Sequence, residues 1–191
     1  MGATNVTTGK PKTTGSVYVA PLGTTLPTDA TTALNSAFKS LGYVSENGLT
    51  NGNTFDTTKI KEWGGGTVLD IEDNYNDAFN FELLETLDVE VLKTVYGSEN
   101  VTGSLSAGIS VSVKPEQHPD LCWVFEMIMR GGVLKRIVLP SASISALAEI
   151  AYRANAAAAY GITLAAHLDS SGKTHYEYIK APTTSGGSEE G

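Results

Sequence analysis

The chain has 191 residues, of which 41% are apolar and 18% charged, and its formal net charge is -8. This length and apolar content are sufficient for one domain with a buried core. Tight nucleic-acid binding is disfavoured, because neutralising phosphates requires clustered Lys and Arg. The acidity is local, since residues 62–92 hold nine of the 21 Asp and Glu residues and no Lys or Arg.

The sequence has no 18-residue apolar segment, and its first 12 residues lack the apolar core of a secretory signal. We therefore expect neither a membrane helix nor export, and synthesis in the cytoplasm. The single cysteine, Cys122, lies in the apolar segment "LCWVFEMIM". It cannot form a disulfide within the chain and is expected to be a buried thiol.

The two ends of the chain are polar and poor in aliphatic side chains, which predicts flexible extensions at residues 1–15 and 182–191. One β domain is expected between them, at residues 16–181. It begins with a strand in "GSVYVA", followed by a short helix in which Leu34 and Phe38 have helical spacing. Residues 43–66 carry two Asn-Gly turn signals and end in three glycines, which predicts a long loop or an exposed hairpin.

The second half of the chain is rich in strand patterns. The sequence from Thr86 favours one helix over residues 86–96, with Leu87, Val91 and Val95 as its apolar stripe and Gly97 as its end. Strands are predicted in seven segments: 67–77, 78–84, 105–113, 121–129, 134–139, 161–168 and 174–179. Residues 143–153 are ambiguous and are interpreted as a further strand, because apolar side chains alternate there. The sum is a mainly β, antiparallel barrel or sandwich with one flanking helix.

The motifs that would indicate catalysis or ligand binding are absent or incomplete in this sequence. "GKT" at residues 172–174 lacks the opening glycine of a P-loop, since His167 stands in that place. The three histidines have no zinc spacing, the acids at 70–77 fail the EF-hand pattern, and no G-x-S-x-G elbow is present. We therefore expect no catalytic residue, no metal and no cofactor, and the protein is not expected to be an enzyme.

Three stretches occur in an order that resembles a known family. Residues 16–50 read "SVYVAPLGTTLPTDATTALNSAFKSLGYVSENGLT", "WGGG" follows at residues 63–66, and "VYGSENVTG" at residues 95–103. This sequence resembles the major tail tube proteins of phages with long, flexible, non-contractile tails, from residue 16 to about residue 180. The alanine-rich run at 154–159 departs from the family pattern.

The resemblance implies a structural virion protein in the phage tail, made in the host bacterial cytoplasm. Members of this family form hexameric rings whose inner sheets join into a barrel, and the rings stack into a tube. The implied partners are further copies of the chain, the tape-measure protein, and the tail tip or baseplate and tail terminator proteins. Double-stranded DNA would pass through the lumen without specific binding, and no membrane is involved.

Two sets of residues follow as expectations for such a tube. Carboxylates in a lumen would repel phosphates and let DNA slide; the candidates are Asp70, Glu72, Asp77, Glu82 and Glu85. Alternation along a strand cannot by itself place them inside or outside the tube. Contacts between rings are expected from the 43–66 segment, with the candidates Asn47, Gly48, Phe55, Ile60 and Trp63. The alternative function is a monomeric β-sandwich recognition module that binds a surface glycan or protein.

Overall fold

The computed structural model describes residues 6–12 and 16–182 and is mainly β, as expected. Its main sheet is antiparallel, and its strands follow one another in this order: β3 (Lys39–Ser40), β2 (Val17–Pro21), β8 (Leu121–Met129), β9 (Leu134–Leu147), β10 (Tyr160–Ala166), β5 (Thr67–Leu83) and β4 (Thr50–Lys61). A separate hairpin contains β6 (Val101–Ser104) and β7 (Gly108–Val111). Within the described chain the main sheet ends in open edges and forms no closed barrel, so the fold is sandwich-like.

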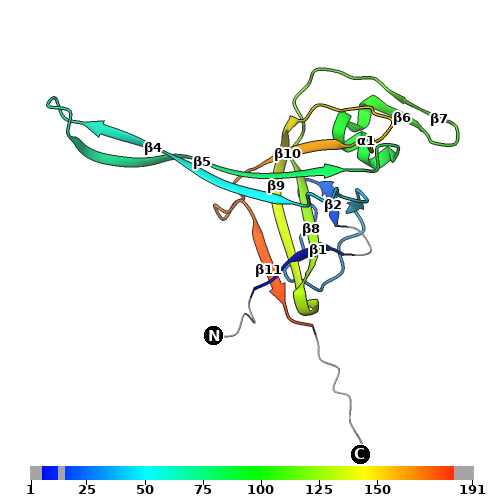
Figure 1. Cartoon of the computed structure of the whole chain (residues 1–191), viewed down its shortest axis with the longest axis horizontal. Coiled ribbons are helices and arrows are strands. Elements are labelled where there is room, and N and C mark those ends of the chain that lie inside the picture. The colour runs from blue at the N-terminus through cyan, green and yellow to red at the C-terminus, as the bar shows by residue number, and fades with distance from the viewer. Residues whose placement is uncertain (1–5, 13–15, 183–191) are drawn as a thin grey trace, which may run out of the picture.

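Two further strands extend the sheet at its lower end in Figure 1, where β8 and β9 continue past their first partners. β1 (Gly9–Pro11) pairs with the end of β8, and β11 (Tyr176–Lys180) pairs with the start of β9. We call this part the lower sheet: β1, β8, β9 and β11 in that order. β1 lies within the segment expected to be a flexible N-terminal extension, so that part of the extension is a strand. The predicted C-terminal extension from residue 183 lies outside the described residues.

Pro140 marks the point at which β9 changes its outer partner. β9 pairs with β11 up to Val138 and with β10 from Ala142 onward. Proline has no N–H to donate, so it is tolerated where a ladder is interrupted. The sequence pattern predicts separate strands at 134–139 and 143–153. The structure has one strand, which ends at Leu147, and residues 148–153 lie outside it.

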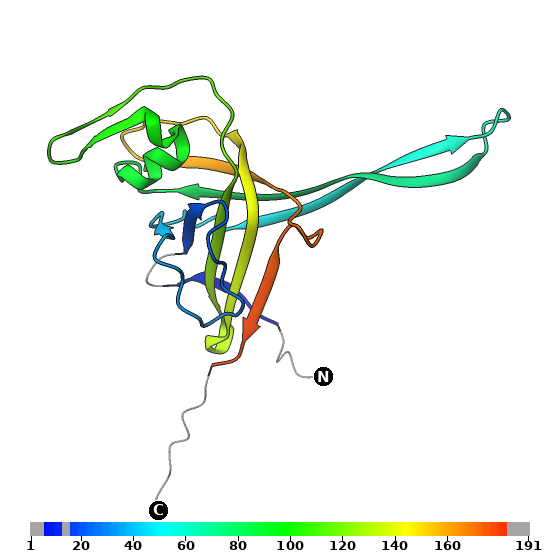
Figure 2. The same ribbon diagram turned by 180° about the vertical axis from the view of Figure 1, so that it is seen from behind.

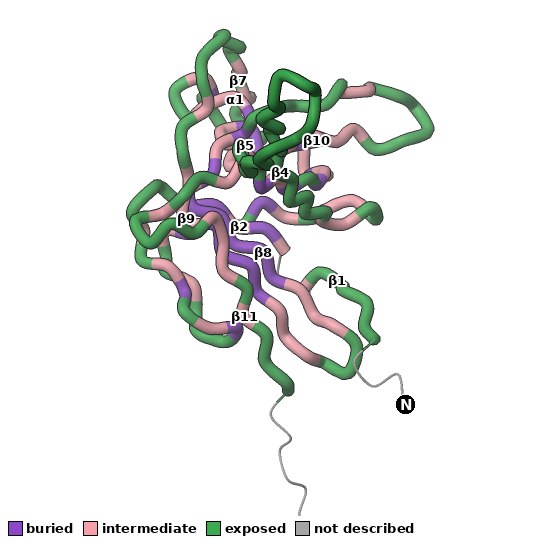
Figure 3. Tube along the Cα trace, turned by 90° about the vertical axis from the view of Figure 1, so that its left-hand side faces the viewer, coloured by how far each residue is buried: buried purple, intermediate pink, exposed green. Residues whose placement is uncertain are grey.

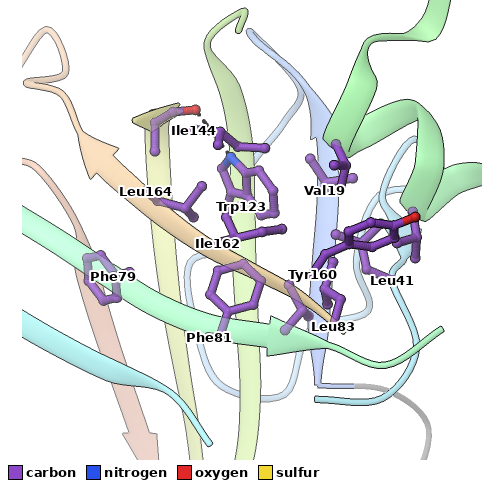
Figure 4. Close-up of a cluster of buried hydrophobic side chains, with 14 of the residues drawn as sticks. Val19, Leu41, Phe79, Phe81, Leu83, Trp123, Ile144, Tyr160, Ile162 and Leu164 are labelled. Atoms are coloured by element: carbon purple, nitrogen blue, oxygen red, sulfur yellow. Dashed lines mark hydrogen bonds between the residues drawn. The ribbon is translucent and has the colours of Figure 1, made fainter. Parts of the chain in front are cut away.

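The core is built from alternate residues of the central strands, because successive side chains point to opposite faces of a sheet. Phe81 from β5 packs edge-on against Trp123 of β8 (Figure 4) and also against Phe125 of the same strand. The indole N–H of Trp123 donates to the carbonyl of Ala142 at 3.2 Å. Full burial of one such large side chain contributes about 1.5–3 kcal/mol. Figure 3 shows the buried positions gathered where β2, β8 and β9 lie together.

The helix α1 (Val89–Tyr96) confirms the expected helix but begins later than residue 86. Asp88 caps it, since its carboxylate accepts from the backbone N–H groups of Glu90 and Val91 at 2.8 and 3.1 Å. Gly97 ends the helix with a φ of 92°, a value that favours glycine. Two short 3-10 turns, Ser98–Asn100 and Arg130–Gly132, occur elsewhere.

The short helix predicted around Leu34 and Phe38 is wrong. Residues 22–38 form an irregular loop, and both side chains join a second apolar cluster with Val124 and Val138 on the far face of β8 and β9. The Asp29 carboxylate accepts from the backbone N–H groups of Thr31 and Thr32 as a helix cap would. Arg136 donates to the carbonyls of Asp29 and Thr32, which a helix starting here would use for its own hydrogen bonds. Leu34 and Phe38 therefore have helical spacing because both contact this second cluster, although the backbone between them is not helical.

The strand predicted at 105–113 is shorter than expected. Residues 105–107 are a turn between β6 and β7, closed by a hydrogen bond from the N–H of Ala107 to the carbonyl of Ser104. Leu105 and Val113 are 66% and 75% exposed, so the apolar side of this alternating segment is only partly buried. Apolar and polar residues do alternate over 105–113, but only residues 108–111 form a strand, β7.

Candidate assembly surfaces

The segment expected to be a loop or exposed hairpin is the first half of a long hairpin made by β4 and β5. Figures 1 and 2 show that the outer part of this hairpin, which we call the arm (residues 53–76), projects away from the rest of the chain. Its described side chains are all exposed. A two-stranded hairpin by itself is only marginally stable in water. The arm therefore has the form of a segment that another molecule supports.

Large apolar side chains are abundant on the arm. They are Phe55, Ile60, Trp63, Val68, Leu69, Ile71 and Tyr75. Trp63, near the tip, is 105% exposed relative to its reference state. Scattered single apolar residues are normal on surfaces, but so many large ones on one projection indicate an interaction site.

The strand register sorts the arm into two faces. Residues directly opposite each other on antiparallel strands share a face. Ile60 pairs with Leu69 and Thr58 with Ile71, so these four residues form an aliphatic face. The register places Asp56 and Asp73 on this same face, farther from the tip. The other face carries the pairs Lys59–Asp70 and Thr57–Glu72.

A polar anchor fixes the base of the arm to the body. Asp77 of β5 is 1% exposed, and its carboxylate accepts from Asn51 Nδ2 at 2.7 Å and lies 2.5 Å from His175 Nδ1. The His175 ring also meets the Phe79 ring edge-on at 5.2 Å. A buried carboxylate requires such partners. Sequence analysis missed this anchor, because Asp77 and His175 are 98 positions apart.

The five residues expected to contact a neighbouring ring lie in two places. Phe55, Ile60 and Trp63 are on the arm. Asn47 and Gly48 are in a turn beside its base, where Asn47 Nδ2 donates to Glu82 Oε2 at 3.2 Å. The structure thus brings three of the five together on one projection.

The five acids proposed for a lumen do not share a surface. Asp70 and Glu72 lie on the charged face of the arm. Glu82 lies near the end of β5 and Glu85 beside the N-terminus of α1, and both are half-buried. Asp77 is buried in the anchor, so burial removes it from the set of candidates. The clustering of acids in sequence therefore does not become one acidic patch.

The lower sheet carries a buried ion cluster that ties three chain segments together. Glu126 of β8 pairs with Arg136 of β9, and both side chains are nearly fully buried. Lys12 donates to the other carboxylate oxygen of Glu126 at 2.9 Å. Arg136 Nη1 also donates to the backbone carbonyls of Asp29 and Thr32, at 2.7 and 2.8 Å. The cluster thereby holds the 22–38 loop against the lower sheet.

One exposed polar group resembles a catalytic set in composition only. Ser143 Oγ lies 2.9 Å and Asp120 Oδ1 3.4 Å from the same ring nitrogen, Nε2 of His167. In a Ser-His-Asp triad the acid binds the opposite nitrogen and orients the ring, so this geometry does not activate the serine. Among the described residues no group of His, Cys, Asp and Glu side chains could hold a metal ion.

The helices of the described part of the chain are all too short or too polar to cross a membrane. The features that stand out are the apolar arm and the open edges of the sheet, and both are typical of a subunit that assembles with other protein chains. They define a structural assembly protein.

The chain belongs to a phage tail tube family, since the family model described as "Phage tail tube protein" matches residues 6–187. This family has a structural role in the virion tail, where its members self-assemble into a tube, and it is typically non-enzymatic. The family predicted from the three sequence stretches is thereby confirmed. No curated protein sequence matches the chain.

Proposed function

We propose that six copies of this chain join side by side through their lower sheets into a ring, and that the rings stack into the tube that conducts DNA to the host. One observation carries the proposal. The outer strands of the lower sheet, β1 and β11, each present an edge that no other described strand covers. Such edges lead to pairing with another chain unless they are covered.

The strand directions suit closure of a ring. Three successive antiparallel pairings separate β1 from β11, so these two strands run in opposite directions. β11 of one copy can therefore add antiparallel to β1 of the next copy. Six lower sheets of four strands would give a barrel of 24 strands. Barrels of about 16–18 strands already enclose a water-filled channel. The number six rests on the resemblance to tail tubes.

The partners of the tube follow from the same resemblance. The lumen would hold the tape-measure protein during assembly and double-stranded DNA afterwards, without specific binding. The ends of the tube would meet the tail tip or baseplate and the tail terminator. The chain would be made in the host cytoplasm and function in the virion. A monomeric recognition module is not favoured, because it leaves the arm without a use.

The arm is proposed to make the main contacts between stacked rings. It projects from the body, and its aliphatic face requires a cover. Shortening it tests this role: residues 55–75 can be replaced by Asn-Gly, the turn preferred between paired strands, because Thr54 and Asn76 are opposite each other. Rings that no longer stack are expected by electron microscopy. Tubes of normal length and stability would contradict the role of the arm.

A repulsive lumen is a separate part of the proposal, now limited to Asp70, Glu72, Glu82 and Glu85. Lysine substitutions at these positions should leave assembly intact and slow DNA release if the side chains face the lumen. Unchanged DNA release would exclude a position of these side chains in the lumen. The position of Asp70 and Glu72 on the arm makes Glu82 and Glu85 the first pair to test.

Ring closure is tested with the purified chain at high concentration. Electron microscopy should show rings or striated tubes. A variant with Lys10→Cys on β1 and Ile179→Cys on β11, treated with a short bismaleimide, should give a ladder that ends at six copies. Leu105→Cys with Ile179→Cys is the matched control, because residue 105 lies in the β6–β7 turn. A ladder that stops at two copies would contradict a closed ring.

A further inference from the structure

A row of four residues crosses the lower sheet from one open edge to the other. Lys10 of β1 is opposite Ile128 of β8, Ile128 is opposite Leu134 of β9, and Leu134 is opposite Lys180 of β11. Cross-strand partners share a face of the sheet. Two aliphatic side chains therefore lie side by side, with an exposed lysine at each end. We call this the basic row.

The surroundings of the row are also basic. Arg130 lies in the turn that joins β8 to β9, and with Lys10 and Ile128 it lines a surface hollow of about 460 Å³. Among the described residues neither Lys10 nor Arg130 forms an ion pair. The carboxylates Glu126 and Glu177 in this part of the sheet are already paired with cations.

The arm has the complementary chemistry. It carries five carboxylates (Asp56, Glu62, Asp70, Glu72 and Asp73) against two lysines (Lys59 and Lys61). On its aliphatic face, Ile60, Leu69 and Ile71 are followed along the ribbon by Asp56 and Asp73. The arm therefore presents an apolar surface next to carboxylates, and the basic row presents an apolar surface next to lysines. Such complementarity favours one partner over others.

The width of the arm also fits the length of the basic row. The basic row spans three inter-strand spacings, about 14 Å at ~4.8 Å each, whereas the two strands of the arm are one spacing apart. The arm can therefore lie on Ile128 and Leu134 with a lysine on either side. Figure 1 shows the arm and the lower end of the sheet pointing in different directions, so the contact takes two copies of the chain.

We infer that the aliphatic face of the arm of one copy docks on the basic row of a copy in the next ring. This rests on the proposed stacking of rings and names the surface that receives the arm. Two other surface hollows fit less well. The hollow beside the N-terminus of α1 has Glu85, Asp88 and Glu90 on its rim, which would repel the arm. The groove between β2 and α1 mixes Lys39, Lys93 and Glu90.

A charge exchange tests the contact. Lys10→Glu with Lys180→Glu should raise the protein concentration needed for stacking by about tenfold or more. Asp56→Lys with Asp73→Lys on the arm should have the same effect. All four changes in one chain should restore tubes, because the pairs then reform with opposite signs. An effect of Lys10→Glu on ring closure alone would not be rescued by changes on the arm.

The matched control is Lys39→Glu with Lys114→Glu, which changes the net charge by the same amount at exposed positions away from the row. It should stack like the unchanged protein. A second measurement mixes Ile60→Cys and Leu134→Cys proteins, which should give heterodimeric cross-links, whereas Ile60→Cys with Leu105→Cys should not.

The outcomes separate this inference from the proposed function. If the row variant stacks normally while the shortened arm does not, the arm docks elsewhere and the inference fails while the tube role stands. Normal stacking of all variants also overturns it. If the unchanged protein and all variants give neither rings nor tubes, the proposed assembly fails together with the inference.

Discussion

Trp123 and Trp63 show how differently the body and the arm use the same side chain. Trp123 is completely buried, contacts Phe81 and donates its indole N–H to a carbonyl. Trp63 lies near the tip of the arm with its whole side chain in solvent. Burial stabilises the monomer in the first case, whereas in the second the apolar surface can contribute only when a partner covers it. Folding thus depends on one set of apolar residues, and assembly is proposed to depend on another.

The largest expected effect distinguishes these two sets directly. Trp123→Ala should lower the free energy of unfolding by about 3–5 kcal/mol, because it leaves a cavity in the core and an unpaired carbonyl. Trp63→Ala should change it by less than about 0.5 kcal/mol, as exposed positions generally do. Urea unfolding of the monomer measures both values.

In tube formation, the substitution of Trp63 should have a clear effect although it hardly changes the stability of the monomer. Trp63→Ala should weaken tube formation at protein concentrations where its monomer is fully folded. A Trp63 variant that unfolds as easily as the Trp123 variant would break the comparison, since the arm would then stabilise the monomer.

The buried ion cluster gives the next effect. Arg136→Met removes the partner of buried Glu126 and the two hydrogen bonds to the 22–38 loop. We expect a loss of about 3 kcal/mol in urea unfolding, because the remaining carboxylate is left buried without its strongest partner. Lys135→Met is the control, since its pair with Glu177 is more exposed, and it should cost under 1 kcal/mol. Equal losses would show that burial of the pair is unimportant.

The anchor at the base of the arm should give a smaller effect. Asp77→Asn keeps the shape of the side chain but weakens the contacts with His175 and Asn51, at a cost of about 1–3 kcal/mol. Hydrogen exchange should accelerate at the base of β4 and β5 more than in β8. Uniform acceleration across the sheet would indicate that Asp77 supports the body and has no special role for the arm.

The smallest effect concerns the 22–38 loop and depends on pH. Hydrogen bonds from the side chain and backbone of Thr32, and then from Thr31, hold the pKa of the Asp29 carboxyl well below its ordinary value of 3.8. A lowered folded pKa means that this carboxylate stabilises the fold above about pH 3.8, and that the contribution is lost as the pH falls toward the folded value. Asp29→Ala should therefore lower Tm slightly at pH 6. The difference should shrink at lower pH, and a difference that stays constant down to pH 2 would contradict it.

Sequence patterns predicted those parts of the molecule that depend on local chemistry. The apolar strand predicted at 121–129 corresponds to β8, and Val91 and Val95 are buried in α1. Leu87, the third residue of the predicted stripe, precedes α1 and is exposed. The 22–38 loop was missed because the spacing of apolar residues indicates which side chains contact the same cluster. It does not determine the backbone conformation that brings them there. In the same way, alternation at 105–113 could not tell a full strand from a short hairpin.

The assembly surfaces were only partly predictable. The 43–66 segment was expected to make contacts, but its amphipathic character appears only when the register pairs Ile60 with Leu69. The basic row and the Asp77–His175 anchor join residues that lie far apart in sequence, and only the sheet topology brings them together. Pairings of this kind leave no local signal in one sequence.

The partner change at Pro140 has a mechanical consequence. A pull on the arm passes from β5 to β10 and then to β9 through hydrogen bonds, but it reaches the lower sheet along the covalent backbone of β9 itself. Peptide bonds do not yield at forces that separate strands, so the junction within β9 is stronger than the pairings of β5 with β10 and of β10 with β9. Under load the arm would therefore separate from the body at these pairings before β9 parted from the lower sheet.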